Sequence, residues 1–168
     1  MFEFRVNDNM PGETIKFDDP GEVRVVARVR SQYPLNRVEI IYNGEVIAEV
    51  KIDGEGLDVR IDEKLSIPRS GWIALRSSGP PQADQPTGTV FGHTSPVYVE
   101  VAGHPIDARK DAEYFIGWIE RLRTDIRRRN RVPTRQQVHV ESQISQAREV
   151  FNKLVGRDKK SNQKLRTD

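Results

Sequence analysis

The spacing of apolar residues changes at Pro105, and this change divides the sequence into two parts that must fold differently. Before Pro105, apolar residues recur at every second position, which is the period of a strand with one buried face. After it they recur at every third or fourth position, which is the period of a helix with one apolar face. We therefore expect a β module over residues 1–105 and helices after it.

The β part contains a series of short alternating segments separated by turn residues. Asn43-Gly44, for example, suits the positive φ angles of a tight hairpin turn. No helical pattern intervenes, which predicts an immunoglobulin-like antiparallel β-sandwich, with Trp72 as its large core residue. The expected strands are 22–30, 37–42, 45–52, 57–62, 71–76 and 96–101, with weaker candidates at 2–6 and 14–17.

The remainder predicts a C-terminal α appendage, a two-helix hairpin over residues 106–156. The first helix begins at Asp107 or Ala108, and the second begins at Thr134, where Thr134 and Gln137 can form a capping box. Gly156 is the expected stop, and residues 157–168 are expected to form a disordered basic tail, because they contain few apolar residues. The apolar arc of the first helix is broad enough for two partners, so we expect the hairpin to pack on the sandwich. The helical stripes are Ala112, Phe115, Ile119, Leu122 and Ile126, then Val140, Ile144, Ala147, Phe151 and Leu154.

Composition excludes several functional classes. The 168 residues include no cysteine, so disulfides, thiolate zinc sites and cysteine nucleophiles are excluded. No apolar run approaches the ~20 residues of a membrane helix, and the N-terminal residues do not have the pattern of a secretion signal. Residues 1–105 carry 11 Lys and Arg against 16 Asp and Glu, whereas residues 106–168 carry 16 against 9. We expect a soluble chain with no membrane partner, acidic in its β part and basic in its helices.

The residues that could perform chemistry are not grouped in sequence. His93, His104 and His139 lack the short spacings that bring two ligands onto one metal ion. His93 lies beside Thr94 and Ser95, but no nucleophile-elbow motif is present, and we interpret His93 as fixing the loop before the last strand. We predict no catalytic, cofactor-binding or metal-binding residue, no cofactor and no enzymatic activity in this chain.

Two kinds of binding site are alternatives. Arginines such as Arg121 and Arg128 could bind a polyanion such as nucleic acid. Asp125, however, lies four residues from both Arg121 and Arg129, a spacing that permits ion pairs on a helix surface. No aromatic residues interleave with the arginines to stack bases. A helical surface with ordinary ion pairs is the favoured interpretation, and nucleic acid is a disfavoured partner. Trp72, Tyr98 and Trp118 could form a carbohydrate-binding surface, although isolated aromatic residues usually belong to a core.

Several segments, in order, suggest a family. They are residues 34–48 (PLNRVEIIYNGEVIA), 70–76 (SGWIALR), 93–99 (HTSPVYV), 111–115 (DAEYF) and Trp118-Ile119. Over residues 22–154 this pattern resembles the C-terminal region of carbaryl-hydrolase-like (CehA/McbA) metallohydrolases of the polymerase-and-histidinol-phosphatase superfamily. The hydrolase part of that family binds metals through clustered histidines and aspartates that begin with a His-x-His motif, which this sequence lacks.

The resemblance implies an accessory role. No catalytic residue carries over, so the chain would be a non-catalytic accessory or interaction module that follows the metal-dependent domain of a larger hydrolase. Its expected partner is that hydrolase domain or a second copy of itself. Members of this layout are often exported, which allows an extracytoplasmic parent protein, but no segment of this sequence fixes the compartment.

Overall fold

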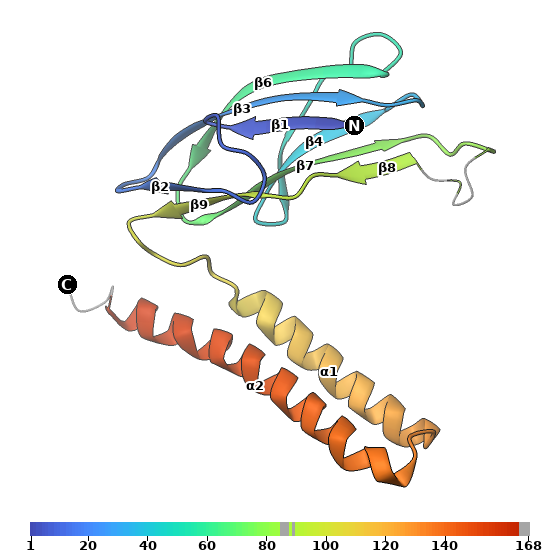
Figure 1. Cartoon of the computed structure of the whole chain (residues 1–168). Helices are drawn as coiled ribbons and strands as arrows, with labels where there is room; N and C mark the ends of the chain where they lie inside the picture. The colour runs from blue at the N-terminus through green and yellow to red at the C-terminus, as the bar shows by residue number, and fades with distance from the viewer. Residues whose placement is uncertain (85–87, 89, 165–168) are drawn as a thin grey trace. The chain divides into compact units, whose positions relative to one another are not determined.

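The computed structural model describes residues 1–84, 88 and 90–164, and side chains as far as Gly156. They form two compact units, Met1–Ile106 and Asp107–Asp168 (Figure 1). The first unit contains β1 (Phe2–Val6), β2 (Thr14–Phe17), β3 (Gly21–Arg30), β4 (Arg37–Tyr42), β5 (Glu45–Glu49), β6 (Asp58–Ile67), β7 (Gly71–Gly79), β8 (Val90–His93) and β9 (Val97–Val101). The second contains α1 (Arg109–Arg129) and α2 (Thr134–Lys164).

The first unit is an immunoglobulin-like β-sandwich, which confirms the predicted fold class. Its smaller sheet has the strand order β1-β3-β6, and its larger sheet has the order β2-β9-β7-β4-β5, with β8 also paired to β7. All pairings are antiparallel except that of β2 with β9, which is parallel. The parallel pair arises because the chain leaves the smaller sheet after β1, turns through Asn7 and Asp8 at positive φ, and joins the edge of the larger sheet as β2.

The core between the sheets follows the period-two pattern of the sequence. Along β3 every second residue from Val23 to Val29 is buried, and the outward positions between them are held by Arg24, Val26 and Arg28. The same spacing extends along β6 beyond the predicted segment as far as Ile67, except that Glu63 is exposed. Inward side chains of the two sheets therefore meet in one apolar layer. The side chains with the least exposure are Ile40, Ile67, Ile73, Leu75, Val6, Val23, Val25, Val29, Val38, Val97 and Val99.

The prediction that Trp72 is the large core residue is wrong. Ile73 and Leu75 are fully buried in the core, so Trp72, one position before Ile73, lies on the opposite face of β7 and is only half-buried. Side chains alternate strictly between the faces of a strand, and the smaller aliphatic residues take the inward positions. The core consists mainly of Val and Ile.

Strand β8 is absent from the predicted set. It contains Gly92, which weakens the strand pattern, and a Cβ at this glycine would lie 3.0 Å from the Phe2 ring, so a larger residue would require that ring to shift. Thr94 then joins β8 to β9, because its backbone N–H donates to the Leu75 carbonyl and its hydroxyl accepts from the Leu75 N–H, each at 3.0 Å. β8 and β9 therefore follow one another along the same side of β7, as one strand interrupted at residues 94–96.

The end of the sandwich from which the chain leaves β9 is closed by hydrogen bonds. The Tyr42 hydroxyl donates to the Arg69 carbonyl oxygen at 2.5 Å, and burial raises the pKa of that hydroxyl. Ser70, which is buried, accepts from the Val101 N–H at 2.8 Å and donates to the His104 carbonyl at 2.6 Å. His104 is thus a turn residue, and its backbone contributes to this closure.

The helices form an antiparallel pair (Figure 1). α1 ends where Asn130 adopts the left-handed conformation and its N–H donates to the Ile126 carbonyl. The predicted capping box does not form, because the Gln137 side chain donates instead to the Val132 carbonyl at 3.5 Å.

α2 begins at Thr134, as predicted, but it does not stop at Gly156. The helix continues to Lys164, so the prediction of disorder from residue 157 is wrong as far as Lys164. A single glycine costs a helix only about 1 kcal/mol, which its neighbours can offset. Residues 165–168 lie outside the described residues. That the hairpin packs on the sandwich stays a prediction.

Candidate interaction surfaces

The six candidate residues fall into two groups. Three of them lie on the larger sheet, Trp72 on β7, His93 on β8 and Tyr98 on β9. The other three, Trp118, Arg121 and Arg128, lie on α1. The two groups belong to different units, and we describe each surface by itself.

The outer side of the larger sheet carries a group of aromatic and aliphatic residues, which we call the aromatic face. Trp72 and Tyr98 are register partners on β7 and β9, and Ile41 and Ala74 are register partners on β4 and β7. Their neighbours in sequence, such as Ile73 and Val99, point into the core, so these four share the opposite side. Tyr98 is 37% exposed, whereas Ile41 and Ala74 are buried.

A buried ion pair adjoins the aromatic face. Glu39 and Arg76 are register partners on β4 and β7, and Arg76 Nε donates to Glu39 Oε2 at 2.7 Å. Only 8% of the Glu39 side chain is exposed, and its second carboxylate oxygen, Oε1, lies 3.9 Å from Arg37 Nε. A carboxylate this buried needs a cationic partner to offset its lost hydration. Sequence analysis missed Glu39, although an acidic residue within the apolar run of β4 could have indicated it.

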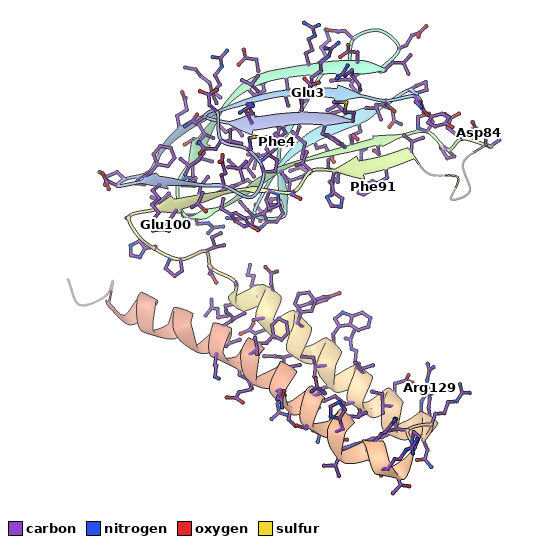
Figure 2. The ribbon with its side chains drawn as sticks, in the orientation of Figure 1. Glu3, Phe4, Asp84, Phe91, Glu100 and Arg129 are labelled. Atoms are coloured by element: carbon purple, nitrogen blue, oxygen red, sulfur yellow. The ribbon has the colours of Figure 1, made fainter. Side chains whose placement is uncertain are left out.

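His93 extends the same side of the sheet. It is exposed, it is the register partner of Arg76, and its ring lies 6.1 Å from that of Phe91, which Figure 2 labels on β8. Its Nδ1 lies 3.1 Å from the Thr94 carbonyl oxygen. Within the described residues, no three His, Cys, Asp or Glu side chains lie close enough together to hold a metal ion.

The outer side of the smaller sheet has a different character, because its charges pair across the strands. Asp62 accepts two hydrogen bonds from Arg24, at 2.6 and 2.5 Å, and Asp58 pairs with Arg28 in the same bidentate way. Hydrogen bonds from these arginines lower the pKa values of both aspartates. Glu3 pairs with Arg30, and Glu22 with Lys64, in addition. This side is a solvated surface with ion pairs between neighbouring strands.

The arginines of the helical pair are also largely engaged. Glu141 on α2 accepts from Arg123 at 2.9 Å and from Arg127 at 2.8 Å, and Asp125 pairs with Arg128 at 2.7 Å and Arg129 at 2.6 Å. The pKa values of both carboxyl groups are lowered by these arginines. The expected pairing of Asp125 is confirmed for Arg129.

Arg121 has a different neighbour from the one that its spacing permits. Its guanidinium lies over the Trp118 ring, 5.7 Å from the ring centroid, which is a cation–π contact and not an ion pair with Asp125. Trp118 is also in edge contact with Tyr114, with ring centroids 6.4 Å apart. The second surface is therefore an exposed aromatic strip along α1.

Comparison with known proteins adds little to this geometry. No protein-family model matches the sequence, and no curated protein matches it. A solved structure of fibronectin(III)-like modules of CbhA from Clostridium thermocellum is similar over 58% of this chain and 96% of that chain, with 16% identity and a TM-score of 0.33. A similarity at this level does not define a family for this chain. None of the helices in the described part of the chain is long and apolar enough to span a membrane.

Proposed function

We propose that this chain is a non-catalytic accessory or interaction module, and that it forms the C-terminal part of a larger metal-dependent hydrolase. The observation that carries the proposal is the aromatic face, where a Trp, a Tyr and buried aliphatic side chains lie on the outer side of a sheet. Apolar groups on the outside of a sandwich, next to a polar rim, are characteristic of a surface that binds a partner. The opposite outer side, with its cross-strand ion pairs, provides the contrast.

The hydrolase assignment rests on the sequence resemblance over residues 22–154 and on the chemistry that the chain leaves to another domain. Metal-dependent hydrolysis needs several ligands that converge on one or two ions, so that bound water loses its proton at neutral pH. In this chain His93 lies on β8 and His139 on α2, whereas His104 lies in the turn after β9. The proposal places the His-x-His site of the family in a domain encoded upstream.

Reading the gene in frame upstream of Met1 tests the assignment. We expect a metallohydrolase domain with a His-x-His motif. In the resulting full-length protein, deletion of residues 22–154 should lower the thermal midpoint or change the assembly state, while kcat changes less than about threefold, because no residue of this chain touches the reacting atoms. An upstream frame without such a domain contradicts the hydrolase assignment, and a deletion that abolishes kcat in a folded enzyme contradicts the non-catalytic role.

Carbohydrate binding by the aromatic face is a second candidate. Trp72 and Tyr98 are neighbours across β7 and β9, and two adjacent rings with polar groups beside them, here Glu39 and Arg76, can stack on sugar rings and accept or donate hydrogen bonds. Affinity electrophoresis in gels that contain soluble polysaccharides tests it. Retardation that is lost in Trp72→Ala but kept in Trp118→Ala supports this candidate, and unretarded migration in every polysaccharide removes it.

A further inference from the structure

Two rows of side chains run side by side along α1, and each follows the alternating steps of four and three residues that define a coiled-coil seam. The first row faces α2. In this row Ala112 is 1% exposed, and Arg123 is held by Glu141 of α2 at 2.9 Å. The row consists of Ala112, Ile116, Ile119, Arg123 and Ile126, and it accounts for the pairing of the two helices.

The second row is offset by one position, and we call it the open row. It consists of Asp111, Phe115, Trp118, Leu122, Asp125 and Arg129. Its three apolar members, Phe115, Trp118 and Leu122, are 46%, 50% and 53% exposed. A helix with one seam needs one neighbour, and a helix with two adjacent seams is characteristic of bundles in which it contacts two neighbours. α1 therefore has the pattern for a second helical partner.

The open row lies on one flank of the helical pair, and ion pairs lie on the other. Hydrogen-bonded pairs join Arg123 and Arg127 to Glu141, and Arg148 to Glu120, so charged groups close the flank opposite the open row. On the open flank, Phe115 stacks on Phe151 of α2 with ring centroids 5.2 Å apart. The aromatic strip of α1 is thus continued by an apolar residue of α2.

The charges at the two ends of the open row favour a second copy of the row in the antiparallel orientation. Asp111 lies in the first turn of α1 and Arg129, which Figure 2 labels, lies in the last. Two copies of the row packed in parallel would bring Asp111 against Asp111 and Arg129 against Arg129. Packed antiparallel about the middle of the row, each Asp111 lies opposite an Arg129, each Trp118 opposite a Leu122, and each Phe115 opposite an Asp125. Arg129 already pairs with Asp125 of its own helix at 2.6 Å, so it would be shared between Asp125 and the Asp111 of the second copy. The antiparallel orientation therefore brings opposite charges together at both ends of the row, whereas the parallel one brings like charges together.

We propose that the open row is an interface with a second copy of this chain, in which the two α1 helices pack antiparallel and the two hairpins form a four-helix bundle. The row from Asp111 to Arg129 is about 27 Å long at the rise of an α-helix, which is enough for several layers of side chains. This inference is independent of the proposed function, because it uses only residues of the helical unit. A dimer is expected whether or not a hydrolase domain is attached.

The mass of the intact chain in sedimentation equilibrium tests the dimer. We expect a concentration-dependent dimer whose dissociation constant rises at least about 100-fold in Trp118→Glu/Leu122→Glu, since two central apolar side chains per copy become charged. Val138→Glu is the matched control, because Val138 is an 82% exposed apolar residue outside the open row, and it should leave the dimer unchanged. Circular dichroism checks that each variant keeps its helices.

Cysteine cross-linking tests the orientation. The sequence contains no cysteine, so any disulfide reports an introduced pair. Asp111→Cys mixed with Arg129→Cys should give an oxidised heterodimer, whereas Asp111→Cys alone should not cross-link. Charge reversal gives the same information, because Asp111→Lys or Arg129→Glu should each weaken the dimer about tenfold, and the double variant should recover most of the loss.

Three results overturn the proposal. The first is a chain that stays monomeric at all concentrations. The second is a dimer that Trp118→Glu/Leu122→Glu leaves intact; if Trp72→Glu dissociates that dimer, its interface is the aromatic face and not the open row. The third is efficient cross-linking of Asp111→Cys to itself, which would show a parallel arrangement.

Discussion

At the scale of single residues, the phase of β7 decides which side chains hold the sandwich together and which meet a partner. Ile73 and Leu75 are fully buried in the core, and Trp72 and Arg76 lie on the other face. Trp72 has the largest side chain in β7, but its truncation should therefore cost less stability than truncation of Ile73 or Leu75.

Truncation of neighbouring residues tests this phase. Ile73→Ala should lower the free energy of unfolding by about 2–5 kcal/mol, because it leaves a cavity among closely packed side chains. Trp72→Ala should cost less than about 2 kcal/mol, because its side chain is only half-buried. Urea unfolding of the intact chain followed by tryptophan fluorescence measures the first, and circular dichroism measures both. A larger loss for Trp72→Ala would restore Trp72 as the core residue.

Removing one partner of the ion pair between Glu39 and Arg76 should cost more stability than removing the charges of both. Arg76→Met should destabilise the sandwich by about 2 kcal/mol, because it leaves a buried carboxylate with weaker compensation from Arg37. Glu39→Gln/Arg76→Met should recover part of that loss, since no charge is left buried. A double-mutant cycle from chemical unfolding gives the coupling energy. Strict additivity of the two single changes would show that the pair does not interact.

At the scale of elements, the sequence pattern located the strands and helices better than their ends. Period-two alternation identified β3 and β4, and a step of three or four identified α1 and α2, because burial of one face sets these periods. It missed β8, where Gly92 interrupts the pattern, and it ended α2 too early, because glycine outside a helix and glycine within one look alike in sequence. The sequence suggested Trp72, Tyr98 and Trp118 as one possible surface, but it could not show that the pairing of β7 with β9 makes Trp72 and Tyr98 neighbours, or that Trp118 belongs to the other unit.

Gly156 tests where α2 ends. In the structure it lies within the helix and a Cβ there would meet no neighbouring atom. Gly156→Ala should therefore raise helix content and stabilise the helical pair by about 0.5–1 kcal/mol. Gly117→Ala is the matched control in α1, where the site is equally open and helical, and it should give a gain of similar size. Destabilisation by Gly156→Ala alone would place a left-handed helix stop at this glycine.

The ion pairs of Glu141 should make the stability of the helical pair depend on pH. Its pKa in the folded chain lies below the ordinary value of 4.5, chiefly because Arg127 and Arg123 donate hydrogen bonds to it. A carboxyl whose folded pKa is lowered stabilises the fold above its unfolded pKa, and this contribution is lost as pH falls through the folded value. The thermal midpoint of the helical signal should thus drop as pH falls below 4.5.

A variant separates this effect from general acid unfolding. Glu141→Gln should lower the midpoint near neutral pH and approach the unmodified chain in acid, so that the two pH profiles converge. Glu113→Gln, a change at an exposed glutamate of α1 outside these two ion pairs, should leave the profile unchanged. Parallel profiles for Glu141→Gln and the unmodified chain at every pH would show that Glu141 does not contribute this pH dependence.

At the scale of the whole molecule, the two units present different surfaces. The acidic sandwich carries cross-strand ion pairs on one of its outer sides and the aromatic face on the other. In the described part of the basic helical unit, Arg123, Arg127, Arg128, Arg129 and Arg148 pair with carboxylates, and the open row of α1 is exposed. Sequence periodicity identified the apolar side of α1, but period alone does not say what covers it, which is why packing of the hairpin on the sandwich stays a prediction.

The central claim is that these surfaces, and not a catalytic site, carry the function of this chain. The most direct test is the hydrolysis of p-nitrophenyl ester and phosphoester substrates by the purified intact chain with added Zn²⁺ or Mn²⁺. We expect a rate equal to that of buffer with the same metal, and no difference between the unmodified chain and His93→Ala, because no set of ligands converges on a metal within the described residues. Metal-dependent hydrolysis above that background, abolished by His93→Ala in a folded chain, would contradict it.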